Sequence, residues 1–425
     1  MREDFLHYLW KHKKFAFAKA CTTSNHPIHI QRVGQHNHLA GPDFFNAQIE
    51  INNQQWAGNV EIHIKSSDWY AHHHETDAAY DSVILHVVWE HDIDIFRKDK
   101  TAIPTLVLKD LVNKTQLDSY KKLFAHQNTA WINCENDLPE VPDVTFDFWL
   151  DRLYLERLAH KTERIKPILD HKNGDWEATL FVLLLRSFGT KVNADAFQSL
   201  GERLDFTIVR KCAQQPFQLE ALLYGMSGIL PEASTDSYAM QLQAEYEYLA
   251  HKFNCSTKGV LPIQFFKLRP PNFPTIRLSQ VAQLYVSHQN LFQKLMEVQS
   301  VAEVYAIFKI QASSYWDTHY NFDGKAQTKR AKKVSTSFID LLIINTLVPL
   351  QFYYKKHLGQ EIDESFFKWV AAVAPEKNTI VSGFNALRPK ASNALQTQSL
   401  IELKTNYCDP NLCLQCAVGN WLLKQ

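Results

Sequence analysis

The first third of the chain contains short stretches in which apolar and polar residues alternate, which is the pattern of half-buried β-strands. Phe44–Ile51 alternates in this way, Asn52–Gln54 predicts a tight turn, and Trp56–Ile64 predicts the returning strand. These segments together predict a β-hairpin. Other elements are expected around it: helices over residues 2–19 and 68–81, and strands over residues 28–35, 83–90 and 105–108.

From about residue 125 onwards the apolar residues recur at helical spacing instead. Residues 146–165 place Trp149 and Leu153 among basic residues, as an amphipathic helix does. Similar patterns cover residues 176–188, 194–204, 219–228, 238–253, 278–298, 301–311, 336–357, 364–374 and 395–405. We therefore predict an α+β protein. Residues 1–125 would form an α/β domain (helix, three strands, helix, strand), and residues 126–425 a mostly α-helical domain that carries a C-terminal cysteine cluster.

Composition and charge narrow the class of protein. The 425 residues are 45% apolar and 21% charged, which is ordinary globular composition. The formal net charge is zero, so nucleic-acid binding would require local basic patches. The longest apolar runs are shorter than the roughly 20 residues that span a bilayer, and Met1–Phe5 is acidic where a signal peptide is basic. We expect a cytoplasmic protein with no membrane partner.

Asp43, Glu61, His63 and Lys65 form the first candidate site. In the predicted hairpin, Asp43 begins one strand and Glu61 lies inside its partner. Because side chains alternate across a strand, Glu61, His63 and Lys65 project from the same face. Two carboxylates beside nitrogen side chains suit a hard divalent cation that activates water and stabilises charge on a phosphoryl oxygen. Ordinary surface charges at a turn are the competing interpretation.

The motif Gly41–Asp43, followed after seventeen residues by Glu61–Lys65, resembles the PD-(D/E)XK nuclease superfamily. The predicted order of elements over roughly the first 115 residues resembles the core of that superfamily as well. This resemblance implies a PD-(D/E)XK-like domain in which Asp43 and Glu61 bind Mg²⁺ or Mn²⁺. It also implies that the substrate is nucleic acid, either DNA or RNA.

His63 departs from the superfamily pattern, because it stands where a lysine is usual. The resemblance then leaves three outcomes: a variant catalytic residue, transfer of the role to Lys65, or loss of activity. In several branches the helix after the last acidic strand carries a further active-site residue. His74 and Tyr80 are the candidates for that catalytic position here.

A dense group of histidines offers a different chemistry. His72–His74 and Asp77 lie on the predicted helix, where residues three or four apart share a face. With Glu61 and His63 they have the nitrogen and carboxylate groups of a zinc site. The alternative is a solvated helix face that is rich in histidine by chance.

A second resemblance extends over the full chain. Gly58–His63, Ser67–Tyr80 and Ile84–Trp89 resemble the corresponding strings of an uncharacterised bacterial protein family. No activity is attached to that family, so this resemblance implies no function of its own.

Cys408, Cys413 and Cys416 lie within nine residues of one another, and Cys134 is available as a fourth ligand. Thiolates in such a group suit a structural Zn²⁺ or an iron–sulfur cluster. Some PD-(D/E)XK nucleases resemble this layout, with one early cysteine and a C-terminal trio that holds an iron–sulfur cluster. The alternative is a set of buried thiols that pack like small apolar side chains.

A basic run follows aromatic residues in the helical part and is a candidate nucleic-acid-binding segment, since such interleaving can track phosphates and stack bases. It consists of Lys325, Lys329, Arg330, Lys332 and Lys333. A solvated loop before the helix that begins at Thr336 is the competing interpretation.

Our first functional hypothesis is a metal-dependent nuclease in which Asp43 and Glu61 hold the metal. The second is a catalytically inactive protein of nuclease fold that binds nucleic acid or protein. The third is a zinc-dependent hydrolase built from the histidines. The chain has no nucleophile-elbow, phosphate-loop or dinucleotide motif. The oligomeric state and the exact substrate do not follow from the sequence.

Overall fold

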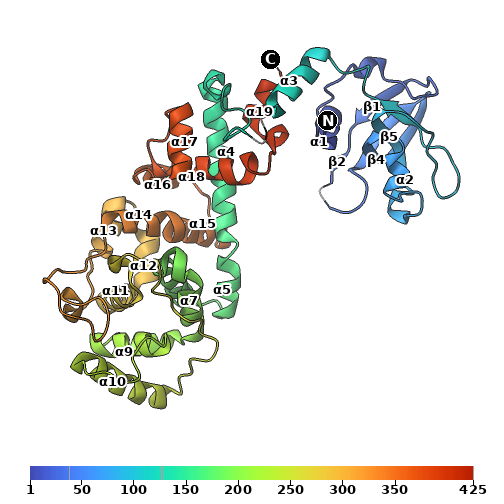
Figure 1. The fold of residues 1–425 in the computed structure, drawn as a ribbon. Coiled ribbons are helices and arrows are strands. Elements are labelled where there is room, and N and C mark those ends of the chain that lie inside the picture. Colours follow the sequence, from blue (N-terminus) through green and yellow to red (C-terminus); the bar gives the residue numbers. More distant parts are fainter. Residues whose placement is uncertain (38, 126, 128, 425) are drawn as a thin grey trace. The chain divides into compact units, whose positions relative to one another are not determined.

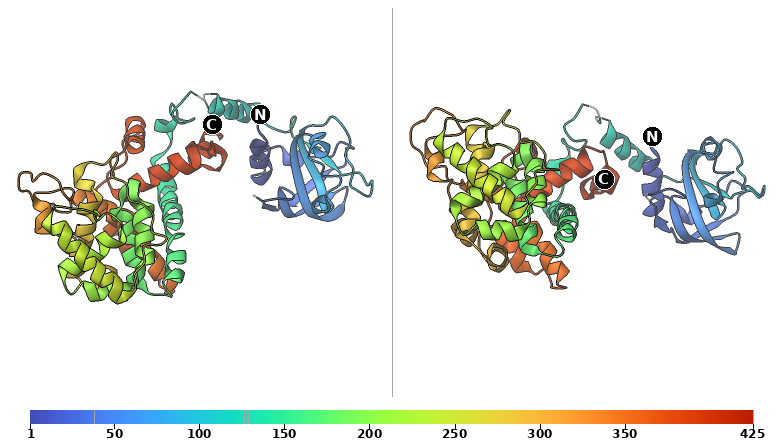
Figure 2. Two further views of the ribbon diagram at one scale, coloured as in Figure 1. Left: turned by 60° about the horizontal axis from the view of Figure 1, so that its bottom comes forward. Right: turned by 90° about the horizontal axis from the view of Figure 1, so that it is seen from below.

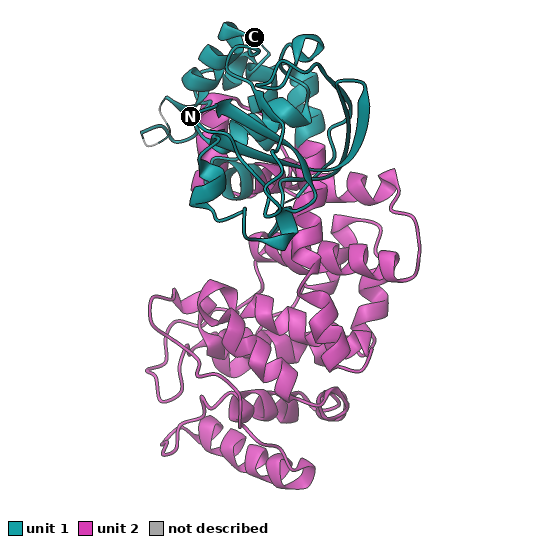
Figure 3. Ribbon diagram, turned by 90° about the vertical axis from the view of Figure 1, so that its right-hand side faces the viewer, with its two compact units in different colours: residues 1–149, 403–425 teal, residues 150–402 magenta. Residues whose placement is uncertain are grey.

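The structure is a computed structural model that describes residues 1–37, 39–125, 127 and 129–424. The chain divides into two compact units (Figure 3): unit 1 comprises residues 1–149 and 403–425, and unit 2 comprises residues 150–402. This division differs from the predicted domains, 1–125 and 126–425. The chain up to Trp149 and the C-terminal segment from Leu403 belong to the unit that contains the sheet.

Unit 1 is built on one six-stranded mixed sheet with the order β1-β3-β4-β5-β6, in which β2 also pairs with β3 (Figure 1). The pairs β1–β3 and β3–β4 are antiparallel, whereas β4–β5 and β5–β6 are parallel. The strands are β1 (Ile28–Arg32), β2 (Gln35–His36), β3 (Phe44–Ile51), β4 (Gln54–Lys65), β5 (Val83–Glu90) and β6 (Thr105–Val107). With the helical unit 2, this sheet confirms the predicted α+β class.

The predicted hairpin joins β3 to β4. Asn52 and Asn53 have φ angles of 50° and 63°, the left-handed region that a two-residue hairpin turn requires and that asparagine tolerates. At the other end of the hairpin Phe44 pairs with Val60. The turn therefore sets the register that brings Asp43 next to Glu61.

The two faces of β4 have different surroundings. Val60 and Ile62 pack in an apolar cluster with helix α1 (Glu3–Lys11), which lies against the sheet (Figure 2). Glu61 and His63 alternate with these two residues and therefore project from the opposite face. Glu61 and His63 thus belong to the face that α1 does not cover.

The segment between β4 and β5 differs from the single helix predicted over residues 68–81. Helix α2 (Asp68–Ala71) is only one turn long, and a 3₁₀ turn η2 (Ala78–Tyr80) follows it. His73 has a φ angle of 59°, which no α-helical residue adopts, and the Asp77 side chain accepts a hydrogen bond that caps η2. The chain therefore loops back over the sheet instead of continuing as a helix.

Helix α1 ends before the predicted residue 19, because Lys13 has a left-handed φ angle of 49°. The remaining helical elements of unit 1 are η1 (Phe17–Lys19), α3 (Lys114–Phe124), η3 (Leu138–Glu140), the first part of α4 (Asp143–Thr162), the π-turn η7 (Lys404–Cys408), η8 (Cys413–Gln415) and α19 (Ala417–Leu422).

Unit 2 consists of helices around one large apolar core, in which α6 is almost wholly buried. Its helices after α4 are α5 (Ile165–His171), α6 (Trp176–Phe188), α7 (Thr190–Arg203), α8 (Phe206–Cys212), α9 (Pro216–Met226), α10 (Ser237–Phe253), α11 (Pro274–Ser287), α12 (Leu291–Glu297), α13 (Val301–Ile307), α14 (Thr336–Leu342), α15 (Val348–His357), α16 (Glu364–Ala371), α17 (Thr379–Leu387) and α18 (Ala394–Leu403). Shorter turns are η4 (Pro270–Asn272), η5 (Ser314–Asp317) and the π-turn η6 (Ile343–Leu347).

One continuous helical stretch in unit 2, Thr336–His357, is long and apolar enough to cross a membrane by length and composition alone. Within its most apolar window 67% of the residues are buried inside the protein. A buried core helix of a soluble protein passes the same test of length and composition. The cytoplasmic location stays a prediction.

Candidate metal centre

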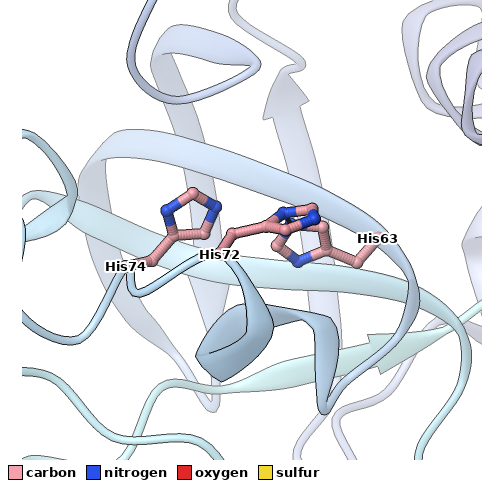
Figure 4. A group of neighbouring side chains, drawn as sticks. All are labelled: His63, His72 and His74. Atoms are coloured by element: carbon pink, nitrogen blue, oxygen red, sulfur yellow. Dashed lines mark hydrogen bonds between the residues drawn. The ribbon is translucent and has the colours of Figure 1, made fainter.

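Three imidazole rings converge in unit 1 (Figure 4). His63 comes from β4, and His72 and His74 come from the loop after α2. One nitrogen from each ring lies within 4.8 Å of the other two, and Nε2 of His63 is 3.1 Å from Nδ1 of His72. His63 and His74 are buried, whereas His72 is exposed. The loop that replaces the predicted helix is therefore what carries His72 and His74 to His63.

Glu61 brings a carboxylate to the same point. Its Oε1 is 3.5 Å from Nε2 of His63 and 3.4 Å from Nε2 of His74. Neighbouring donors around a tetrahedral zinc ion, with bonds of about 2.0–2.1 Å, are about 3.4 Å apart. In the described part of the chain, Nε2 of His74 is buried without a hydrogen-bond partner. Glu61, His63, His72 and His74, which we call the histidine cluster, therefore have the donor atoms and spacing of a metal site.

Backbone amides link Asp43 to Glu61 by hydrogen bonds. The amide of Asp43 donates to Oε2 of Glu61 at 3.1 Å, and the amide of Ile62 donates to Oδ2 of Asp43 at 3.0 Å. Nε2 of His7, from α1, lies 3.2 Å from the same Oδ2 atom. Each carboxylate is thus held by the strand that carries the other, as the hairpin predicted.

The carboxyl groups share a region of concentrated negative charge. Burial, and then the charge of Asp43, raise the pKa of Glu61 to about 8. Burial and the charge of Asp43 also raise the pKa of Glu3, on α1, to about 7. Carboxyl groups that are costly to ionise together are the groups that a bound cation stabilises.

His63 is oriented by a second buried histidine. Its Nδ1 atom lies 2.8 Å from Nε2 of His86, which projects from β5 beside β4. Burial and the neighbouring imidazoles lower the pKa of His63 to about 3, and burial lowers that of His86, so both rings are neutral. Only one of the two facing nitrogens can then carry a proton. If His63 Nδ1 donates, its Nε2 lone pair points into the histidine cluster.

Tyr80 supports His74 from the side. Their rings stack at a centroid distance of 3.7 Å, and the indole of Trp69 meets the His74 ring edge-on at 5.3 Å. Burial, with the charges of Glu61 and Asp43, raises the pKa of Tyr80 to about 12, so its phenol stays protonated. Trp69 and Tyr80 belong to one small apolar cluster, which explains their helix-like spacing in a segment that is not a helix.

The structure therefore brings together Asp43, Glu61, His63, His74 and Tyr80 from the predicted catalytic residues. Lys65 is exposed at the end of β4, where its amide donates to Asp68 at 2.9 Å. The sequence did not lead us to predict that His7 belongs to the site. The available signal was its spacing of four residues from Glu3 on a helix, which places both side chains on one face.

The predicted nucleic-acid-binding run lies in unit 2, in the segment before α14. Lys325, Lys329, Arg330 and Lys333 are exposed there. Lys332 is buried instead: its Nζ donates to the carbonyl of Asp317 at 3.3 Å and lies 4.1 Å from the centre of the Tyr320 ring. Four of the five residues are therefore accessible, and Lys332 is a structural residue.

The predicted cysteine ligands all belong to unit 1. Cys134 precedes η3, Cys408 ends η7, Cys413 begins η8 and Cys416 immediately precedes α19. All four are free, and Nδ2 of Asn133, the residue before Cys134, donates to Sγ of Cys413 at 3.4 Å.

The fold and these contacts define an α+β protein with a partly buried histidine–carboxylate cluster on one face of a mixed sheet. The chain belongs to the family described as "Protein of unknown function (DUF2851)", whose model matches residues 3–379. This match confirms the resemblance to an uncharacterised family. No curated protein and no solved structure matches the chain.

Proposed function

We propose that this protein is a metal-dependent hydrolase that cleaves phosphodiester bonds of nucleic acid, with its metal held by the histidine cluster. The observation that carries the proposal is the convergence of Glu61 Oε1 with Nε2 of His63 and Nε2 of His74 at 3.4–3.5 Å. The buried Nε2 atom of His74, which makes no hydrogen bond to the described residues, supports it.

The donor set favours one kind of metal. Imidazole nitrogens suit zinc and related transition metals, whereas Mg²⁺ prefers an all-oxygen shell. Three imidazoles and one carboxylate therefore favour zinc over the magnesium that the nuclease resemblance implies. Four protein donors would fill a tetrahedral shell, so a cation held there would act on a phosphoryl oxygen or a water through a fifth coordination position.

The residues around the cluster have distinct parts in such a reaction. Glu61 and Asp43 are fixed by backbone amides, so they hold their geometry without reorganising. The pKa of His7 is raised: burial alone would lower it, but the hydrogen bond and charge of Asp43 outweigh burial. A protonated His7 is therefore a suitable general acid for the leaving oxygen.

The choice of a phosphodiester substrate rests on the arrangement of elements. Helix α1, the antiparallel strands β1, β3 and β4 and the parallel strand β5 occur in the order that the PD-(D/E)XK resemblance implies, whereas the helix expected between β4 and β5 is reduced to the single turn α2. Asp43 and Glu61 meet where that resemblance implies paired carboxylates. The exposed basic residues of unit 2 offer contacts to a phosphate backbone.

One observation favours the non-catalytic alternative. The usual lysine position is His63, whose ring nitrogens face His86 and His72, and Lys65 is exposed at the end of its strand. A nuclease fold that had lost its lysine would show this arrangement. Activity measurements separate the two proposals.

The test is a cleavage assay on single- and double-stranded DNA and RNA with Zn²⁺, Mn²⁺, Mg²⁺ or a chelator. His74→Ala removes one donor, and we expect a loss of at least 100-fold in rate. The matched control is His73→Asn: His73 is the exposed neighbour outside the cluster, and asparagine tolerates its left-handed φ angle. Absence of cleavage with every metal would reject the hydrolase and leave the binding module, whereas equal cleavage rates in the two variants would reject the histidine cluster as the site of the metal.

A further inference from the structure

Unit 2 contains a cavity with a basic lining. Its volume is about 430 Å³, which is within the range of small-molecule sites, and its walls come from α6, α7, α14 and the π-turn η6. Three of the lining residues are basic: Arg164, which immediately precedes α5, Arg186 on α6 and Lys191 on α7. None of the described residues that line the cavity is acidic. The charge of the cavity therefore suits an anion.

The three basic side chains are only partly neutralised. Nη1 of Arg186 lies 2.6 Å from Oδ1 of Asp195. Among the described residues, no group forms a hydrogen bond or an ion pair with the guanidinium of Arg164 or the ammonium of Lys191, and both residues are exposed. Burial, and then the charge of Arg186, lower the pKa of Arg164. Two positive charges at the cavity thus have no counter-ion from the described part of the chain.

Two asparagines in the lining add hydrogen-bond donors. Oδ1 of Asn345 accepts from Nζ of Lys161 at 2.9 Å, and Oδ1 of Asn272 accepts from Nη2 of Arg277 at 2.6 Å. A side-chain amide whose oxygen is occupied in this way keeps its N–H groups as donors. The lining therefore offers N–H groups together with positive charge, which is the complement of an anionic ligand rich in acceptor oxygens.

Arg277 is a buried charge behind the cavity wall. It is 6% exposed, and its guanidinium carbon lies 3.7 Å from the centre of the Phe338 ring, which lines the cavity. Nη1 donates to Gln280 at 2.9 Å, but Nε is buried and has no hydrogen-bond partner in the described part of the chain. A buried guanidinium that lacks a carboxylate partner is costly. An anion in the cavity would offset part of that cost.

The turn between α6 and α7 is strained where it borders the cavity. Thr190, a lining residue, has a φ angle of 55°, which is unfavourable for a β-branched side chain. The turn is also tight, because a Cβ atom on Gly189 would lie 2.4 Å from the carbonyl oxygen of Asn193. Backbone strain of this kind is concentrated at ligand sites. Thr190 therefore supports a binding role for the cavity.

Much of the remaining lining is apolar. It comprises Leu183, Phe338, Leu341 and Leu342. A ligand that joins an anionic group to an apolar or planar body would match both parts of the cavity. A phosphate monoester carries about 1.5 to 2 negative charges at neutral pH, whereas a carboxylate or a phosphate diester carries only one. The two unneutralised positive charges therefore favour a monoester.

We propose that this cavity binds a phosphate monoester of nucleotide size. Arg164, Arg186 and Lys191 would hold the phosphate, and the apolar wall around Phe338 would hold the body of the ligand. The site belongs to unit 2 and does not depend on the proposed hydrolase function of unit 1. The same chemical group occurs on free nucleotides and at the ends of oligonucleotides.

The test is calorimetric titration of the full chain with adenosine monophosphate, adenosine and inorganic phosphate, with a chelator present to keep the histidine cluster free of metal. We expect adenosine monophosphate to bind at least about 10-fold more tightly than adenosine, because hydrogen bonds to a charged group are among the strongest in proteins. It should also bind more tightly than inorganic phosphate, which has no apolar body.

An oligonucleotide with and without a 5′-phosphate distinguishes the two sources of the monoester. Tighter binding of the phosphorylated strand than of adenosine monophosphate would support a site for strand ends, and the reverse order would support a site for a free nucleotide. Equal binding of each probe with and without its phosphate, or no binding of any phosphorylated probe, would overturn the proposal.

Arg164→Gln/Lys191→Gln removes two exposed cations that have no partner among the described residues, so thermal unfolding should be unchanged. The affinity for adenosine monophosphate should fall at least about 10-fold, and the affinity for adenosine should not change. The matched control is Arg210→Gln/Lys258→Gln, which removes one exposed arginine and one exposed lysine elsewhere in unit 2 and should bind normally. Undiminished affinity in the first variant, or an equal loss in the control, would also overturn the proposal.

Discussion

Asp43 and Glu61 are joined by reciprocal hydrogen bonds: the amide of Asp43 donates to Glu61 at 3.1 Å, and the amide after Glu61 donates to Asp43 at 3.0 Å. The two carboxylates are therefore placed by the β3–β4 hairpin itself. Their proximity is costly, because the charge of Asp43 opposes ionisation of the buried Glu61. Both the stability of the protein and its affinity for metal should therefore depend on this pair and on the neighbouring imidazoles.

Metal-free protein should lose stability as the pH rises from about 4.5 to about 8. The pKa of Glu61 is raised to about 8 in the folded state, so folding favours its protonated form, and that contribution is lost as the carboxyl ionises. Thermal unfolding across this pH range, with and without Zn²⁺, measures the effect. Glu61→Gln should flatten the metal-free profile, and an unchanged slope in that variant would contradict the assignment.

His86→Leu should weaken metal binding at the histidine cluster by about 10- to 100-fold, because His86 positions the His63 ring without reaching the metal. His86→Gln should recover part of the loss, since its amide oxygen can accept from His63 Nδ1. Competition titration with a metal chelator gives the affinities. His91→Ala, which changes a histidine paired with Asp94, is the control and should bind normally. If His86→Leu bound metal as tightly as the natural protein, His86 would have no part in positioning the His63 ring.

Gly58→Val should destabilise the protein by about 1–3 kcal/mol. A Cβ atom at Gly58 would lie 2.4 Å from Cγ2 of Ile84 and 2.6 Å from the carbonyl oxygen of Ser82, so β4 and β5 would have to move apart. Chemical denaturation measures the change. Because Glu61 and His86 face each other across the same strand pair, metal affinity should fall as well. A variant as stable as the natural protein would contradict the β4–β5 register.

Replacing the four exposed basic residues of the segment before α14 by glutamine should lower the affinity for nucleic acid. It should also reduce the dependence of that affinity on salt concentration. The logarithmic slope should fall by up to about 0.9 for each duplex phosphate that the protein no longer neutralises. The variant combines Lys325→Gln, Lys329→Gln, Arg330→Gln and Lys333→Gln. Binding to labelled DNA and RNA at several salt concentrations provides the slope. Lys258→Gln/Lys309→Gln removes exposed charge elsewhere in unit 2 and should bind normally. Equal slopes would show that nucleic acid does not bind at this segment.

The sequence predicted the hairpin well, because both of its determinants are local. Apolar alternation fixes the faces of β3 and β4, and the asparagines at the turn fix the register. These two features of the sequence are sufficient to predict that Asp43 lies close to Glu61.

The convergence of the imidazoles did not follow from the sequence, because it depends on a loop. Trp69 and Tyr80 have helical spacing, yet both pack in a small apolar cluster outside any long helix. His73 ends the helical conformation through its left-handed φ angle, which the residue type does not predict. The contact between His7 and Asp43 is tertiary, and periodicity carries no information about it. Only the number and spacing of the cysteines in the sequence suggested that Cys134 belongs with the C-terminal cysteines.

The most direct test of the central claim is anomalous X-ray diffraction from crystals of the natural protein soaked in Zn²⁺ or Mn²⁺. We predict a peak about 2.1 Å from Nε2 of His63, Nε2 of His74, Nδ1 of His72 and Oε1 of Glu61. A peak coordinated only by the oxygens of Asp43 and Glu61, or no peak on this face of the sheet, would contradict the histidine cluster as the metal centre.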